Sequence, residues 1–383
     1  MQSAFSQYYS RPDDETFTNF PDWSANIHGR NANSSAQEIP TNNLEFQSMK
    51  DMGLCQAISH TPDFENDQEL ALVVNNNPVA MTNYGFSSIT SRIAPGGGRY
   101  LKTLPAPIAA QALNYSAQTY PKEELLGLFR GHDTHDEFRA FTSTQYGRIW
   151  DSQIVDAVSN MLQDHPEFTN PPTWKKDQDG NTVMGGLYAS DRDMYGIFID
   201  GGSIVDAGWN SLRQQHDTLH RGFIVSNSEV GHASFELQMF LFRAICGNHS
   251  IWGQEQTKTI KIRHNVNAPD QFAEQAVPLI MNHAQASVSG LETGIKKAKE
   301  HRIPVEEGEV AKWLQTQGYT AVQARNGVLL AKSEEGKCDT FWDIHQGLTA
   351  YARQMTHMDS RTALEKKSTD DFLKEVAVEL EVA

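Results

Sequence analysis

Residues 221–264 read RGFIVSNSEVGHASFELQMFLFRAICGNHSIWGQEQTKTIKIRH, and they combine long apolar runs with embedded polar side chains. RGFIVSNSE and ASFELQMFLFRAIC are predicted to form two strands, or a strand and a helix, and TKTIKIRH a short strand. Polar groups in apolar surroundings are costly unless they are paired, so the block indicates a specified structural network. Its expected members are Asn227, Ser228, Glu229, Gly231, Asn248 and His264.

Strand and helix patterns flank this block on both sides. Upstream, strands are predicted in LALVV, LLGLFR and FRAFTS, and helices in FSSITSRI, APIAAQALNYSAQTY and DSQIVDAVSNMLQDH. From about residue 269 the spacing of apolar residues turns helical. The expected class is α+β, an antiparallel sheet core with packed helices followed by a helical C-terminal region. We expect the core domain over 46–268 and the helical region over 269–383.

Residues 1–45 differ in composition from the rest of the chain. They are rich in Asn, Ser, Asp and Pro, with scattered aromatic residues such as Tyr8, Phe20 and Trp23. Such a composition is typical of a flexible segment, so we predict a flexible acidic N-terminal arm. Its aromatic side chains are expected to dock either on the body of the same chain or on a neighbouring subunit.

The overall charge argues against non-specific attraction to phosphates or anionic lipid. The 383 residues carry 32 basic and 48 acidic side chains, a net charge of −16. One window, residues 71–120, has three bases and no acid. The three cysteines are widely spaced, which favours a reducing compartment over a disulfide framework. No apolar run reaches about 18 residues, so we expect a cytoplasmic protein without membrane contact.

Several polar residues have a catalytic or metal-binding alternative. Glu229 fits a general base or metal ligand, but pairing with Arg243 or Arg263 is favoured, because no second clustered carboxylate is evident nearby. His216 and His220 are spaced as on one helix face, but the Glu of an HExxH motif is missing. We therefore assign no catalytic residue, no metal site and no cofactor, and an enzymatic activity is the less favoured reading.

Basic residues recur at the ends of the predicted strands and near aromatic residues such as Tyr146 and Trp150. Interleaved cations and aromatic rings on a sheet can hold a phosphate backbone and stack bases. The alternative is that each cation pairs with one of the many acids. The candidate nucleic-acid-binding residues are Arg99, Lys102, Arg139, Arg148, Arg192, Arg243, Lys258, Lys261 and Arg263.

Three phrases and a final Arg-His pair occur in a recognisable order: FRAFTSTQYGRIWDSQIVDAV, LYASDRDMYGIFI, GFIVSNSEVGHASFELQMFLFRAICGNHSIWG and IRH. Together they resemble the phage/plasmid-like family catalogued as "domain of unknown function 932". The resemblance covers roughly 80–265, with the N-terminal arm and the helical tail outside it. His249 departs from the pattern, since a Gly usually follows the Asn there. The resemblance implies a location in phage and plasmids, and a distant likeness to single-strand annealing proteins.

The favoured hypothesis is a homo-oligomeric mobile-element protein that binds single-stranded nucleic acid during annealing or recombination, in the cytoplasm of a bacterial host. One alternative is an acidic structural or host-interaction protein with an anti-defence role, which the charge of −16 would suit. A second alternative is a metal-assisted hydrolase that uses His216, His220, Glu229 or His264.

Overall fold

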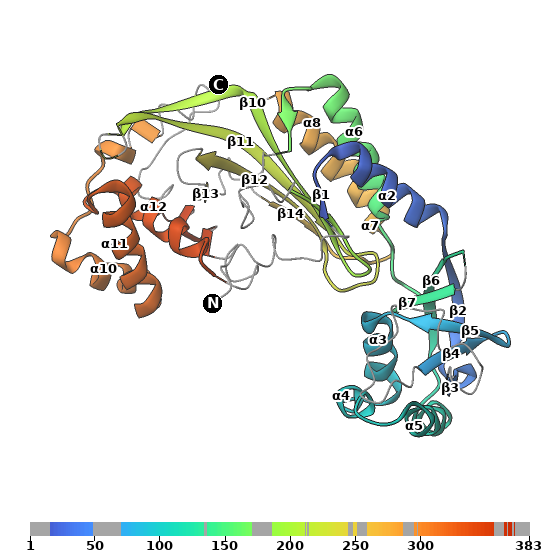
Figure 1. The fold of residues 1–383 in the computed structure, drawn as a ribbon. Coiled ribbons are helices and arrows are strands. Elements are labelled where there is room, and N and C mark those ends of the chain that lie inside the picture. Colours follow the sequence, from blue (N-terminus) through green and yellow to red (C-terminus); the bar gives the residue numbers. More distant parts are fainter. Residues whose placement is uncertain are drawn as a thin grey trace, which may run out of the picture.

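The computed structural model describes most of the chain. The described residues are 16–48, 70–133, 136–170, 186–210, 212, 214–243, 248–250, 259–285, 295–296, 298–355, 364–365, 367–369 and 371. They form two β-sheets with helices packed on them and a group of helices towards the C-terminus, which confirms the predicted α+β class (Figure 1).

The larger sheet, here called the long sheet, contains the 221–264 block. Its strands are all antiparallel, and a long hairpin forms its centre (Figure 1). In spatial order they are β1 (Thr16–Phe17), β9 (Leu187–Ala189), β10 (Met194–Asn210), β11 (Gln215–Asn227), β12 (Phe235–Arg243) and β13 (Asn248–Ser250), with β14 (Thr259–Ile262) also on β12 and β8 (Phe168–Thr169) on β10. The strand alternative for both halves of the block is the correct one.

Helices cover the apolar face of the long sheet. They are α2 (Phe20–Ala32), α6 (Asp151–Asp164), α7 (Ala268–Gln271), the π-helical turn η3 (Phe272–Ala276) and α8 (Val277–Gln285). Their apolar residues meet Phe198, Phe223 and Met239 of the strands in one continuous core. Helix α6 buries Ile154, Val158 and most of its other apolar positions, as the helical spacing of 151–164 predicts.

A smaller sheet, here called the short sheet, lies at the other end of the molecule from the C-terminal helices (Figure 1). Its order is β2 (Ser34–Pro40), β6 (Glu124–Gly131), β7 (Asp136–Ser143), β5 (Asn77–Met81), β4 (Leu70–Val74) and β3 (Glu45–Ser48), with η2 (Thr41–Asn43) between β2 and β3. Strands β5 and β7 pair in parallel. Parallel neighbours need a crossover, and α3 (Asn83–Ile93), α4 (Gly98–Leu101) and α5 (Ala106–Thr119) lie within it.

The predicted helical C-terminal region is confirmed. It contains η4 (Glu307–Glu309), α10 (Val310–Thr316), α11 (Ala321–Glu335) and α12 (Phe341–Ala352). Its apolar residues pack against Val205, Leu219 and Leu241, in the half of the long hairpin remote from the short sheet. Among the described residues, no helix combines the length and apolarity that crossing a bilayer requires.

The prediction of a flexible arm is wrong for residues 16–45. These residues form β1, α2 and β2, and the side chain of Trp23 is fully buried. Its indole Nε1 donates to the carbonyl oxygen of Tyr188 at 3.0 Å, so the aromatic residue docks on the body of its own chain. The polar composition of this segment concealed a few strong apolar anchors. Residues 1–15 lie outside the described residues.

Candidate functional site

The turn after β11 joins the two sheets. Asn227 ends the strand, and Gly231 completes the turn with a φ of 82°, a conformation that favours glycine. Between them, Glu229 points into the protein and is only 5% exposed. Its Oε2 accepts a hydrogen bond from Nη1 of Arg139 at 2.6 Å. Since Arg139 belongs to β7, this ion pair ties the long sheet to the short one.

The start of α6 completes this buried network. The backbone N–H of Asp151 donates to Oε1 of Glu229 at 3.0 Å, and the Asp151 carboxylate accepts from the amide of Asn227 at 2.7 Å. Nε of Arg148 donates to the carbonyl oxygen of Glu229 at 3.0 Å. The carboxylate of Glu229 thus receives two donors, which orients α6 and β7 around one side chain.

The two carboxyl groups of the network titrate in opposite directions. Burial opposes ionisation of Glu229, but the charge and the hydrogen bond of Arg139 outweigh it and lower the pKa of Glu229. Burial, followed by the neighbouring charge of Glu229, raises the pKa of Asp151 well above its ordinary value of 3.8. The pKa values of two adjacent buried acids move apart in this way because the ionised form of one disfavours ionisation of the other.

Aromatic rings cover the outer side of this network. The hydroxyl of Tyr146 donates to the carbonyl oxygen of Ser228, and its ring stacks on His264 at a centroid distance of 4.9 Å. The guanidinium of Arg148 lies over two rings, 5.4 Å from that of Tyr146 and 5.2 Å from that of Trp150. These contacts hold half-buried aromatic faces at the surface of the junction.

Residues of the short-sheet unit extend this aromatic surface. Tyr84, near the start of α3, meets the exposed His232 edge-on at 5.6 Å. Tyr84 also packs on the same small apolar cluster as Trp150. Burial raises the pKa of Tyr84 and the positive charge of Arg192 opposes that rise, which places this charge near the phenol. Beside Tyr84, Asn83 accepts a hydrogen bond from Nζ of Lys102 at 2.7 Å.

We call this surface the junction strip. It consists of Tyr84, Tyr146, Arg148, Trp150, Arg192, His232, Arg263 and His264. Arg263 is exposed and directly precedes His264 in the chain. The guanidinium groups of Arg192 and Arg263 form no ion pair with any described residue. The strip therefore presents positive charge next to aromatic faces, although the whole chain is acidic.

Three of the arginines predicted to bind nucleic acid are buried. Arg139 is 2% exposed, Arg148 8% and Arg243 1%. A guanidinium enclosed in protein cannot reach a phosphate, so the prediction of direct contact is wrong for these three. Arg148 keeps an indirect role, since it supports the rings of the strip from beneath.

The other predicted cations are scattered. Lys261 is exposed but ion-paired with Glu236 of the neighbouring strand. Arg99 is exposed on α4, and Lys102 is half-buried and held by Asn83. Lys258 lies outside the described residues. The described residues therefore do not bring the nine predicted cations into one continuous groove.

Arg243 belongs to a second buried network, at the end of the sheet remote from the junction. Its guanidinium pairs with the carboxylates of Asp217 and Glu335. It also lies over the ring of Trp342, 5.3 Å from the ring centroid. Because Glu335 lies on α11, this network fastens the C-terminal helices to the sheet. Asn248 pairs in register with Arg243, so its predicted membership of the Glu229 network is wrong.

The geometry of the described residues argues against the metal-assisted hydrolase. His216 and His220 lie in strand β11, not on a helix, and four residues along a strand span about 13 Å. Glu229 follows the opposite end of that strand. Across the part of the chain that the structure describes, no group of three or more His, Cys, Asp or Glu side chains could hold a metal ion.

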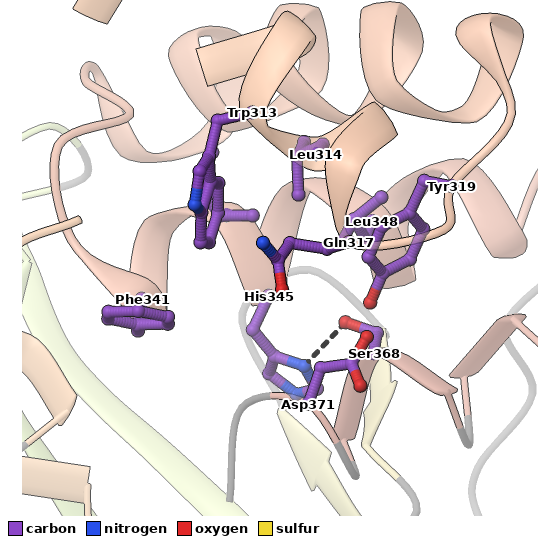
Figure 2. A pocket seen from close by; sticks show the side chains of 10 residues that line it. Trp313, Leu314, Gln317, Tyr319, Phe341, His345, Leu348, Ser368 and Asp371 are labelled. Atoms are coloured by element: carbon purple, nitrogen blue, oxygen red, sulfur yellow. Dashed lines mark hydrogen bonds between the residues drawn. The ribbon is translucent and has the colours of Figure 1, made fainter. Parts of the chain in front are cut away.

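A small pocket lies among the C-terminal helices. Figure 2 shows its lining side chains, which include Trp313, Gln317, Tyr319, Phe341, His345, Ser368 and Asp371. Nδ1 of His345 is 2.9 Å from Oγ of Ser368, but burial lowers the pKa of His345 to about 3. So weak a base does not activate a hydroxyl. Lys367 pairs with Asp371 and lies over the ring of Tyr319, so these groups hold the segment around 364–371 in place.

Comparison with known proteins gives a family match over part of the chain. Residues 208–365 match the model of the family described as Domain of unknown function (DUF932). The predicted resemblance to this domain of unknown function is confirmed. The DUF932 match differs in extent from the expected 80–265, because it includes the C-terminal helices and omits residues 80–207. No curated protein and no solved structure matches this chain.

The DUF932 segment contributes only part of the junction strip. It supplies His232, Arg263 and His264, and it contains the complete contact of Arg243 with Asp217 and Glu335. Sequence reasoning missed Tyr84 and Asp151 as members of the site. A signal was present for Asp151, an acid at the start of a strongly amphipathic helix. No sequence signal pointed to Tyr84, because its role depends on a contact with His232, which is far away in the sequence.

Proposed function

We propose that this protein binds single-stranded nucleic acid along the junction strip. The observation that carries the proposal is the set of aromatic contacts at the junction, with Arg192 near Tyr84 and the exposed Arg263 next to His264 in the chain. Neither arginine forms an ion pair with a described residue. Stacking of bases on aromatic side chains contributes about 1–3 kcal/mol per base and tolerates any sequence. Phosphate contacts add affinity that falls with salt.

Each part of the junction has a role in this proposal. Tyr84, Tyr146 and Trp150 would stack bases, while Arg192 and Arg263 would contact phosphates. Burial of Glu229 and Asp151 keeps the two nearest carboxyl groups of the network away from the bound backbone. Lys102, beside Tyr84, would extend the track towards α4. Binding of this kind requires no cofactor, because stacking and ion pairing supply the free energy.

The biological setting belongs to the same proposal. Open bases held on one face of a protein are available for pairing, which suits strand annealing or recombination. The resemblance to a phage- and plasmid-borne family supports this setting, within the cytoplasm of a bacterial host. A homo-oligomer would align several strips along one strand.

The test is a binding titration with a fluorescent single-stranded oligonucleotide at low salt. We expect the double variant Arg192→Ala/Arg263→Ala to bind more weakly, and its logarithmic salt slope to fall by about 0.7 for each lost phosphate contact. The matched control is Lys312→Ala/Arg325→Ala, which removes the same charge from exposed positions on α10 and α11. Absence of binding by the unmodified protein, or equal binding by the two double variants, would overturn the proposal.

A further inference from the structure

The outer face of α5 is exposed and has an apolar character. Ile108 and Tyr115, two helical turns apart on one side of the helix, are 52% and 73% exposed. Gln111 lies between them on the same side and is also exposed. The opposite side of α5 buries Ala109, Leu113 and other apolar residues in the short-sheet core. We call Ile108, Gln111 and Tyr115 the α5 outer face.

This face is unusual in an acidic chain, because no charged residue occurs anywhere in Ala106–Thr119. The surrounding window, residues 71–120, carries only bases, and Arg99 on the adjacent α4 is exposed without an ion pair to any described residue. An exposed apolar face near an exposed cation favours an acidic, apolar partner.

The same chain contains a segment with the complementary chemistry. Residues 372–383 read FLKEVAVELEVA, with three acids and one base, a net charge of −2. Phe372, Val376 and Leu380 recur every four residues, the spacing that puts side chains on one face of a helix. As a helix this segment would present an apolar stripe bordered by carboxylates.

The segment would have to reach α5 on a second molecule. Asp371, the last described residue, lines the pocket among the C-terminal helices. Figure 1 places α10, α11 and α12 at one end of the molecule and α5 at the other. A helix of twelve residues is only about 18 Å long. Docking on α5 of the same molecule is therefore disfavoured by the fold.

We propose that residues 372–383 of one copy dock as an amphipathic helix on the α5 outer face of another copy. The two surfaces differ, so the contact is heterologous, and it generates an open filament or a closed ring, of which the smallest is a dimer with reciprocal contacts. Ile108 and Tyr115 would receive the apolar stripe, while Arg99 would attract its carboxylates. The contact does not involve the junction strip, so this proposal can be tested independently of nucleic-acid binding.

The test measures molar mass in solution, without nucleic acid, for the full chain and for two variants. One variant, Tyr115→Glu, places a charge on the α5 outer face. The other, Val376→Glu/Leu380→Glu, places charges on the apolar stripe of the acidic segment. We expect oligomers from the full chain and monomers from each variant alone. A one-to-one mixture of the variants should give a dimer, because each retains the surface that the other has lost.

Two controls separate this contact from other causes of association. Leu329→Glu places the same charge at an apolar residue of α11 that is 62% exposed, and it should leave the oligomer unchanged. Circular dichroism spectra of all variants should match that of the full chain. A labelled peptide spanning 368–383 should bind Val376→Glu/Leu380→Glu but not Tyr115→Glu, and more weakly as salt rises.

Several results would overturn the proposal. They are a monomeric full chain, variants that keep the full oligomeric mass, or a mixture that remains monomeric. A peptide that binds both variants equally would point to a different docking surface. Membrane vesicles or host proteins that bind through Tyr115 while the chain stays monomeric would identify another occupant of the α5 outer face.

Discussion

Arg139 and Glu229 lie 90 residues apart in the chain, and their side chains meet at 2.6 Å between the two sheets. Both side chains are buried, at 2% and 5% exposure. Desolvation offsets much of the attraction in such a pair, so its formation alone says little about stability. Removal of one partner is strongly destabilising, because the remaining charge stays buried and uncompensated.

Replacement Glu229→Gln should therefore destabilise the protein. It leaves the guanidinium of Arg139 without its counter-charge, and we expect the free energy of unfolding to fall by about 3–5 kcal/mol. Urea unfolding followed by tryptophan fluorescence measures this change. The control Asp151→Asn keeps an oxygen to accept from Asn227 and should cost far less. Equal stability of Glu229→Gln and the unmodified protein would contradict a structural role for the pair.

The stability difference between Asp151→Asn and the unmodified protein should depend on pH. Because the folded-state pKa of Asp151 is raised, the folded protein binds more protons than the unfolded chain above about pH 4. Stability of the unmodified protein then falls, relative to the non-ionising variant, as pH rises from about 4 through the raised pKa. Unfolding titrations of both proteins at several pH values test this. The prediction fails if the unmodified protein gains stability relative to Asp151→Asn as pH rises from about 4.

The ring of Tyr84, rather than its hydroxyl, should matter for nucleic-acid binding. Tyr84→Ala should weaken binding of a single-stranded oligonucleotide by about 1–3 kcal/mol if one base stacks there. Tyr84→Phe keeps the aromatic face and should bind almost as the unmodified protein does. Dissociation constants for the two variants provide the measurement. Similar losses for both would exclude stacking on this ring.

Gly347 of α12 should not tolerate a side chain. A Cβ at this position would meet the carbonyl oxygen of Gly327 on α11, so the two helices approach closely only because both residues are glycines. Gly347→Ala normally favours a helix by about 1 kcal/mol, yet here we expect a net loss of about 1–3 kcal/mol from overpacking. Gly308→Ala is the control, since nothing lies within 4 Å of a Cβ there. A stabilised Gly347→Ala variant would refute the close approach.

Much of the fold followed from the sequence because its elements are defined locally. The strand pattern of LLGLFR and the helical spacing in 151–164 each correspond to an observed element. The division into two sheets did not follow, because it depends on pairings between remote segments. Strand β2 reaches its partner β6 across more than eighty residues, and no local pattern encodes that pairing.

The candidate site was predicted only in part, for a similar reason. The turn at Asn227–Glu229 was identified as a structural network, but its partner Arg139 was assigned to an open surface. Strand alternation tells which side chains share a face, not which face another part of the chain will cover. Arg139 and Arg243 share that ambiguity, and both faces proved to be covered.

The burial of Trp23 has a consequence for how the chain matures during synthesis. Its indole docks against Tyr188, a residue made 165 positions later. At a translation rate of about 5–20 residues per second, the interval is roughly 8–33 s. Until then the side chain of Trp23 lacks the acceptor that holds it in the folded protein. Its final burial is therefore a late event, which follows the synthesis of β9.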